Sequence, residues 1–228
     1  MCRPGWSPIV ELRQYVLRPG QRDVLIDLFD AELVEPQEEV GMKVIGQFRD
    51  LDRPDRFVWL RGFPDMSARA RSLAAFYGGP VWKAHGEAAN ATMLDSDDVL
   101  LLRPARPDSA FVLDGDRRPR GGFVAAVVMQ LDAPADEEIV SFFEASIAPS
   151  VAPSGGSILG YFVTEASENT FAGLPVREGE HVFAWFAGFA DRDGLERATE
   201  LQGDRAQVLH LAPTSRSLLH GRNEKECQ

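Results

Sequence analysis

One pattern, F-x-W-x-x-G-F-x-D, occurs twice in this chain, at residues 57–65 (FVWLRGFPD) and at residues 183–191 (FAWFAGFAD). The two copies are offset by 183 − 57 = 126 residues. Further upstream, Gly46 matches Gly160 at an offset of 160 − 46 = 114. The second copy therefore carries 126 − 114 = 12 extra residues, which we place in a loop over 163–179 that could act as a lid.

Each copy predicts the order strand, helix, strand, strand, helix, strand. Apolar residues four apart, such as Leu25 and Phe29, or Leu73 and Tyr77, indicate amphipathic helices, and Asp65 is placed to cap the second of these. β-rich runs bounded by turn residues indicate the strands. In the first copy we expect strands at 8–17, 42–49, 56–63 and 99–102. In the second we expect strands at 123–131, 157–164, 181–189 and 215–220, with helices at 136–147 and 191–202.

This order is the ferredoxin-like plan, a four-stranded antiparallel sheet with both helices on one face. The other face stays bare, and a bare apolar face must find a partner. We therefore expect an α+β protein in which two ferredoxin-like βαββαβ repeats pack sheet to sheet and enclose a barrel. The expected divisions are a first repeat over 1–105, a linker over 106–120 and a second repeat over 121–228.

Composition excludes several classes of protein. The chain has 228 residues, a formal net charge of −11 and 44% hydrophobic residues, which is typical of a soluble globular protein. The acidic balance argues against nucleic-acid binding, and no apolar run is long enough to span a membrane. The N-terminus shows no signal peptide, and the two cysteines, Cys2 and Cys227, form no disulfide framework. We expect a cytoplasmic location.

Strand alternation sorts the side chains into two sets. We assign the set with the smaller aliphatic residues to the helices, which leaves the other set to line the space between the two sheets. That space then has one charged wall and one apolar wall, as a small-molecule site does. The expected lining is Glu11, Arg13, Tyr15, Phe57, Trp59 and Arg61 from the first repeat and Ala125, Val127, Met129, Phe183, Trp185 and Ala187 from the second.

The opening of the first repeat carries a family resemblance. The run V-E-L-R-Q-Y at 10–15, followed by L-R-P-G at 17–20, resembles the E-L-R-x-Y and P-G signature of the NIPSNAP family. The resemblance covers residues 8–103 well and residues 121–220 more weakly. It implies the dimeric α/β-barrel superfamily, which includes cofactor-independent monooxygenases, lactone isomerases and haem-binding relatives. NIPSNAP proteins have no settled activity, so the resemblance carries over no catalytic residues.

Five residues are candidates for chemistry. Arg13 and Arg61 could stabilise an oxyanion or enolate. Glu11, Tyr15 or His85 could move a proton. The alternative is that Glu11 and Arg13 neutralise each other as a structural pair, that Tyr15 is a core aromatic, and that Arg61 reaches the rim.

Six aromatic residues are candidates for ligand binding: Phe57, Trp59, Trp82, Tyr161, Phe183 and Trp185. Trp59 and Trp185 occupy matched positions of the repeat, so the alternative for them is packing that serves the fold. The four histidines show no zinc-binding spacing, and we expect neither a metal nor a cofactor.

Two functions follow from these residues. The first is a cofactor-independent enzyme that oxygenates, isomerises or cyclises a small apolar or aromatic molecule bound between the sheets. The second is a non-catalytic ligand-binding or interaction module. The expected partner is a small molecule, and a homodimer is the other assembly considered.

Overall fold

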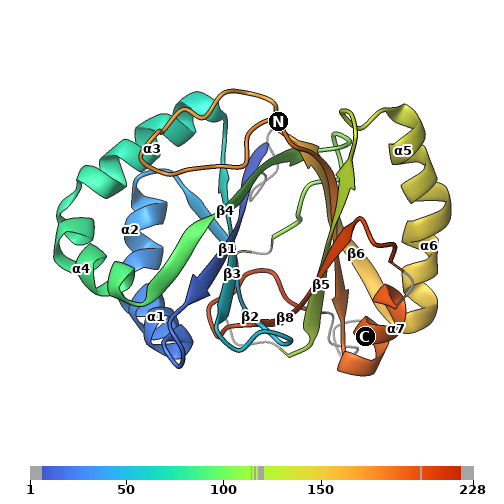
Figure 1. Cartoon of the computed structure of the whole chain (residues 1–228), viewed down its shortest axis with the longest axis horizontal. Helices are drawn as coiled ribbons and strands as arrows, with labels where there is room; N and C mark the ends of the chain where they lie inside the picture. Colours follow the sequence, from blue (N-terminus) through green and yellow to red (C-terminus); the bar gives the residue numbers. More distant parts are fainter. Residues whose placement is uncertain (1–6, 114, 116, 118–120, 201, 222–228) are drawn as a thin grey trace.

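The computed structural model describes residues 7–113, 115, 117, 121–200 and 202–221. Eight antiparallel strands form one closed barrel in the order β1-β3-β2-β8-β5-β7-β6-β4 (Figure 1). The first half of the chain supplies β1 (Ile9–Leu17), β2 (Lys43–Asp50), β3 (Arg56–Phe63) and β4 (Met93–Pro104). The second half supplies β5 (Phe123–Leu131), β6 (Gly156–Thr164), β7 (His181–Phe189) and β8 (Ala206–Pro213).

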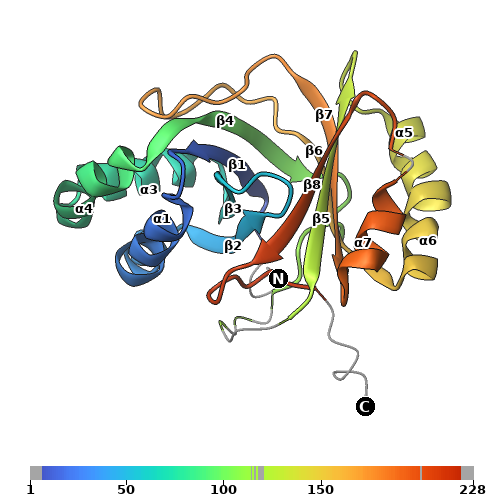
Figure 2. The same ribbon diagram turned by 60° about the horizontal axis from the view of Figure 1, so that its bottom comes forward.

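Helices cover the outside of this barrel on two opposite sides, while the two four-stranded sheets face each other (Figures 1 and 2). The predicted α+β class and the sheet-to-sheet packing of two ferredoxin-like units are confirmed. No helix in the described ranges is long and apolar enough to cross a membrane. The first half carries α1 (Arg22–Leu28), η1 (Phe29–Leu33), α2 (Val34–Glu39), α3 (Met66–Gly78) and α4 (Pro80–Ala91). The second half carries α5 (Glu137–Phe142), η2 (Phe143–Ile147), α6 (Ala148–Val151), η3 (Ala152–Ser154) and α7 (Arg192–Thr199).

The two halves repeat even their irregularities. A π-helical turn, η1 in one half and η2 in the other, follows the first helix at an offset of 143 − 29 = 114 residues. A β-bulge precedes Gly46 in β2 and Gly160 in β6. Trp59 pairs with Arg13 on β1, and Trp185 pairs with Val127 on β5. The offsets of 114 and 126 measured in the sequence therefore correspond to equivalent places in the two sheets.

Apolar side chains from both sheets fill the barrel interior. Phe162 and Phe186 lie there with Phe111, whose ring centroid is 4.7 Å from that of Phe162 and 5.0 Å from that of Phe186. Phe111 comes from the connection between the halves, and Leu218 and Leu219 enter from the chain after β8. The interior is thus packed like a protein core rather than held open for a ligand.

The glycines at the two bulges make room for this packing. A Cβ at Gly46 would lie 2.5 Å from Cζ of Phe48, and a Cβ at Gly160 would lie 3.0 Å from Cε2 of Phe162. Each glycine therefore lets the ring two residues further along lie against its own backbone.

The predicted direction of the side chains is wrong. Val10, Leu12, Val58 and Leu60 point into the barrel, where residues of both sheets meet. The charged and aromatic set of β1 and β3 instead lies beneath the helices of the first half, and its counterpart on β5 and β7 lies beneath those of the second. The barrel interior takes mainly aliphatic and phenylalanine side chains, which carry no polar atoms, whereas the layer under the helices takes the Trp and Arg side chains, and the arginines find polar partners on the helices and the loop.

Two elements also differ in position from the predictions. The last strand is β8, Ala206–Pro213, rather than 215–220, because the apolar residues after it enter the barrel interior instead of pairing. Strand β4 spans Met93–Pro104 and is longer than the predicted 99–102, since its polar first part still pairs with β1. The predicted helix cap is confirmed: Asp65 accepts a hydrogen bond from the Ala68 amide at 2.6 Å.

Candidate functional site

One buried carboxylate and three buried guanidinium groups lie between the sheet and the helices of the first half. We call Glu11, Arg13, Arg61 and Arg69 the Glu11 cluster. Glu11 and Arg13 stand on the same face of β1 because they are two residues apart, and Arg61 lies directly opposite Glu11 on β3. Arg69 reaches them from α3. All four residues are at most 1% exposed.

Glu11 is bonded through both of its carboxylate oxygens. Oε2 accepts from Nη1 of Arg13 at 2.9 Å and from Nε of Arg61 at 2.6 Å. Oε1 accepts from Nε of Arg69 at 2.6 Å. Arg13 also donates from Nε to the hydroxyl of Tyr15 at 2.9 Å. The alternative of a simple Glu11–Arg13 pair is therefore wrong, since two further arginines share the same carboxylate.

The cluster keeps Glu11 ionised. Burial alone would raise the pKa of Glu11, but Arg61, Arg13 and Arg69 outweigh that effect and hold the pKa far below its usual range. A carboxylate with so low a pKa is a weak base, which disfavours Glu11 as a proton acceptor. Burial raises the pKa of Tyr15, although Arg13 opposes this, so Tyr15 keeps its proton at neutral pH.

The long loop of the second half covers the cluster. Nη1 of Arg69 donates to Oδ1 of Asn169 at 2.9 Å and to Oγ1 of Thr170 at 3.1 Å. The ring of Phe171 stacks on Tyr77 with a centroid distance of 5.8 Å and an angle of 27° between the ring planes. Figure 1 shows this loop in orange, reaching from the ends of β6 and β7 across to α3. The site of the first half thus includes residues from the second.

An aromatic cavity of about 20 Å³ adjoins the cluster, and a space of this size holds about one water molecule. Tyr15, Gln37 and Tyr77 bring polar atoms to it. Gln37 and Tyr77 connect it to the cluster, because Nη1 of Arg61 lies 3.4 Å from Oε1 of Gln37 and 3.5 Å from the Tyr77 hydroxyl. We call this space the first-half cavity; its lining is Tyr15, Leu25, Phe29, Leu33, Gln37, Trp59, Phe76, Tyr77, Trp82, Ala89 and Met93.

Three polar residues that the helices of the first half bring to this site were not among the predicted candidates. Arg69 lies four and seven residues before Leu73 and Phe76, so it interrupts the apolar face of α3, and that interruption was the available signal. Gln37 is buried on α2 in an otherwise acidic stretch. Tyr77 was counted only as an apolar helix residue, although its hydroxyl faces Arg61.

The structure divides the predicted site residues between two separate layers. Tyr15, Trp59 and Trp82 line the first-half cavity, and Phe57 packs in the same cluster of buried residues. Tyr161, Phe183 and Trp185 belong instead to the core of the second half. No single space between the sheets joins the two groups, because both lie on the helix side of their own sheet.

His85 lies outside the first-half cavity and close to the surface. Its side chain is 34% exposed, and its Nε2 lies 3.5 Å from Oε2 of Glu32. It is not part of the lining of the first-half cavity. His85 does not reach the space between the two sheets, because α4, which carries it, covers the outside of the barrel (Figure 1).

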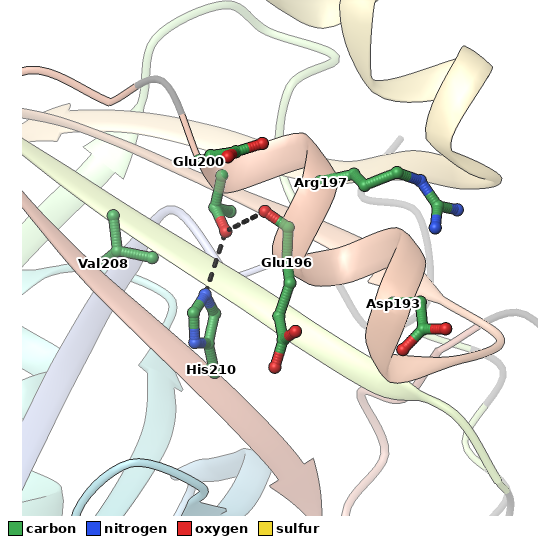
Figure 3. Close-up of a pocket in the computed structure, with 7 residues that line it drawn as sticks. Asp193, Glu196, Arg197, Glu200, Val208 and His210 are labelled. Atoms are coloured by element: carbon green, nitrogen blue, oxygen red, sulfur yellow. Dashed lines mark hydrogen bonds between the residues drawn. The ribbon is translucent and has the colours of Figure 1, made fainter.

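A second, open hollow of about 480 Å³ lies beside α7 and β8 (Figure 3). His210 is part of it, with Nδ1 2.8 Å from Oδ2 of Asp52 and Nε2 2.9 Å from Oγ1 of Thr199. The order carboxylate, imidazole, hydroxyl also occurs in hydrolases. Here, however, Oγ1 of Thr199 also donates to the carbonyl of Leu195 at 2.9 Å, so it serves the helix backbone. His210 joins α7 to the β2–β3 turn.

The closed barrel made of two ferredoxin-like halves defines the class of this protein, the dimeric α/β barrels, here within one chain. Two solved structures share the whole fold. A candidate monooxygenase from Fusobacterium nucleatum has a TM-score of 0.59 at 10% identity, over 96% of this chain and 97% of its own. A candidate monooxygenase from Lactobacillus acidophilus has a TM-score of 0.52 at 13% identity, over 91% and 94%.

Residues 10–107 match the NIPSNAP family model, so the first half of the chain is similar to NIPSNAP domains. An uncharacterized NIPSNAP-like domain protein from Burkholderia xenovorans is 26% identical over 47% of this chain and 97% of its own, with a TM-score of 0.40. A comparison with curated proteins gives no match. The match of residues 10–107 to the family model confirms the predicted resemblance over residues 8–103.

Proposed function

We propose that this protein binds a small, mainly apolar or aromatic molecule in the first-half cavity and catalyses its cofactor-independent oxygenation, isomerisation or cyclisation. The observation that carries the proposal is the cavity itself, an aromatic space with a few polar groups at one end, which is the composition of small-molecule sites. The site lies under the helices rather than between the sheets. The names of the two whole-fold relatives support oxygenation among the three reactions.

The residues adjoining the cavity suit chemistry at a carbonyl. Arg61 would stabilise negative charge that develops on a substrate oxygen. Tyr15 and Tyr77, whose hydroxyls lie beside Arg13 and Arg61, would hold or donate the proton. Oxygenation without a cofactor requires the substrate to supply the electrons, so that a CH₂ group and O₂ give a carbonyl and water.

The cavity is too small for a ligand as it stands, so binding must open it. Two features allow this. Tyr77 and Trp82 are only half-buried, and η1, which supplies Phe29 and Leu33, is a π-helical turn of the kind often found at functional sites.

We further propose that the chain arose as a tandem repeat and that its second half serves to support and cover the site of the first. The cytoplasmic location and a homodimer stay predictions.

Binding is tested by calorimetric titration with 1-naphthamide, a neutral aromatic probe. We expect binding to the wild-type protein and about a tenfold higher Kd in Trp82→Ala, which removes a half-buried aromatic wall of the cavity. Phe142→Ala is the control, because Phe142 is an exposed aromatic residue of the second half. Absence of binding by both 1-naphthamide and 1-naphthoate, which has nearly the same shape, or an equal effect of both substitutions would contradict the proposal.

The non-catalytic module is the second candidate, and one observation favours it: Glu11, the carboxylate of the cluster beside the cavity, is held by three arginines and is a poor base. Oxygen uptake and product analysis with 1-naphthol, a probe that can itself supply electrons, separate the two. Turnover above the uncatalysed rate that falls in Tyr77→Phe supports the enzyme. Binding without turnover of this and related probes supports the module.

A further inference from the structure

The Glu11 cluster carries more positive charge than its one carboxylate can balance. Arg13, Arg61 and Arg69 contribute +3 and Glu11 contributes −1, which leaves 3 − 1 = +2 in a region that is at most 1% exposed. Guanidinium groups keep their proton at any ordinary pH, so this charge cannot be removed by deprotonation. Uncompensated buried charge is costly, and proteins normally pair it.

The remaining partners of the cluster do not supply the missing negative charge. Both oxygens of Glu11 are already bonded to arginines. The other acceptors are neutral groups: Gln37 and Tyr77 beside Arg61, and the loop residues Asn169 and Thr170 beside Arg69. Across the described part of the chain, no second carboxylate pairs with these three arginines.

Two guanidinium nitrogens are also left without an acceptor. Nη2 of Arg61 and Nη2 of Arg69 are buried and have no hydrogen-bond partner among the described residues. Nε1 of Trp59 is in the same situation, but so is Nε1 of its counterpart Trp185, which lies in the apolar core of the second half. The indole donors therefore belong to the repeated fold, whereas the two free arginine donors distinguish the first half.

We infer that the ligand of the first-half cavity is an organic carboxylate whose negative charge is bound by Arg61 and Arg69. This inference rests on the proposed function and names the chemical class of its substrate. A planar carboxylate accepts two hydrogen bonds from a guanidinium fork and brings the negative charge that the cluster lacks. The apolar body of the ligand occupies the aromatic cavity.

A ligand in the cavity reaches Arg61 only if the side chain of Tyr77 moves. Gln37 and Tyr77 lie between the cavity and Arg61, and Tyr77 is half-buried, so it can turn aside as the ligand enters. Arg69 lies under the loop residues Asn169 and Thr170. The carboxylate thus binds where the two halves of the chain meet, and Arg69 then contacts both the ligand and the loop.

Matched pairs of probes test the inference on the wild-type protein. We compare benzoate with benzamide and 1-naphthoate with 1-naphthamide by calorimetry at pH 7 in a buffer of low chloride content. Each pair has nearly the same shape and differs in charge. We expect each carboxylate to bind at least about tenfold more tightly than its amide, since a charge-assisted hydrogen bond is about twice as strong as a neutral one.

Substitutions then locate the carboxylate. Arg69→Gln is expected to reduce the preference to less than about threefold, and circular dichroism checks that the variant folds. Arg106→Gln is the control, because Arg106 lies in the connection between the halves and pairs with Glu137 and Glu144 at the surface. It should leave the preference unchanged.

The outcomes separate the two proposals. If carboxylates and amides bind the wild-type protein equally well, the inferred ligand class is wrong and the proposed function stands. If neither member of any pair binds, the proposed function fails and the inference fails with it. A preference that survives in Arg69→Gln but is lost in Arg106→Gln would place the carboxylate elsewhere and also overturn the inference.

Discussion

Glu11 and Arg61 lie directly opposite each other on β1 and β3, and Nε of Arg61 donates to Oε2 of Glu11 across 2.6 Å. The strand register fixes this contact, because it places both side chains on the face beneath the helices. Arg13 joins from the same face of β1, and Arg69 closes the cluster from α3. Glu11 is thus the one negative group that holds three separate elements of the first half together.

Removing the charge of Glu11 should destabilise the protein strongly. Glu11→Gln leaves three buried guanidinium groups without a counter-charge, and we expect a loss of about 3–5 kcal/mol in the free energy of unfolding. Urea denaturation measures this. Glu137→Gln is the matched control, because Glu137 pairs with Arg106 on the surface and should matter little. Equal effects of the two substitutions would show that the cluster is not a structural hub.

Stability should depend on acid pH through Glu11. The pKa of Glu11 is lower in the folded protein than its ordinary value of 4.5, so its stabilising effect is complete above that value and is lost as the pH falls below it. We expect the free energy of unfolding to fall as the pH drops below about 5 and to be still falling at pH 3. The drop should be smaller in Glu11→Gln, which has no group to titrate there. Identical pH profiles would contradict this assignment.

The filled barrel interior predicts a large cavity cost. Phe186 is fully buried against Phe111 and Phe162, so Phe186→Ala should lower the free energy of unfolding by about 3–5 kcal/mol. Phe142→Ala removes an exposed ring and serves as the control. A loss below about 1 kcal/mol in Phe186→Ala would mean that the interior is open enough to tolerate the truncation.

The bulge glycine of β2 should resist substitution. A methyl group at Gly46 would meet the ring of Phe48, which is fully buried and cannot move freely. Gly46→Ala should therefore cost about 1–3 kcal/mol of unfolding free energy. Gly203→Ala is the comparison, because a methyl group at Gly203 would have no neighbouring atom within 4 Å. Similar stability of both variants would argue against the close packing of Phe48.

The loop between β6 and β7 should loosen when its aromatic anchor is removed. Phe171 stacks on Tyr77, and Phe171→Ala removes this aromatic contact while the polar contacts of the loop with Arg69 remain. We expect a glutamate-specific protease to cut at Glu168 or Glu178 several times faster than in the wild type. Phe142→Ala should be cut at the wild-type rate. An unchanged rate in Phe171→Ala would count against the loop as a lid.

The sequence predicted the site residues on β1 and β3, but not those that the helices and the long loop bring to the site. Glu11, Arg13 and Arg61 were found because strand alternation and an unusual charge in an apolar strand marked them. Arg69 interrupts the apolar face of α3, but that pattern does not show which residue of the sheet the interruption faces, so its contact with Glu11 was missed. Asn169 and Thr170 could not be found at all, since they join the site from about 100 residues away.

The sequence by itself determined the two-fold repetition, the order of the elements and the offsets of 114 and 126 residues, because periodicity and turn residues are local properties. Only the tertiary structure decided which face of each strand points into the barrel. In each sheet, helices cover one face and the opposite sheet covers the other. Both faces are therefore buried, and neither can be recognised in the sequence as the one exposed to solvent. Alternation therefore separates the two sets of side chains without showing which set lies inside.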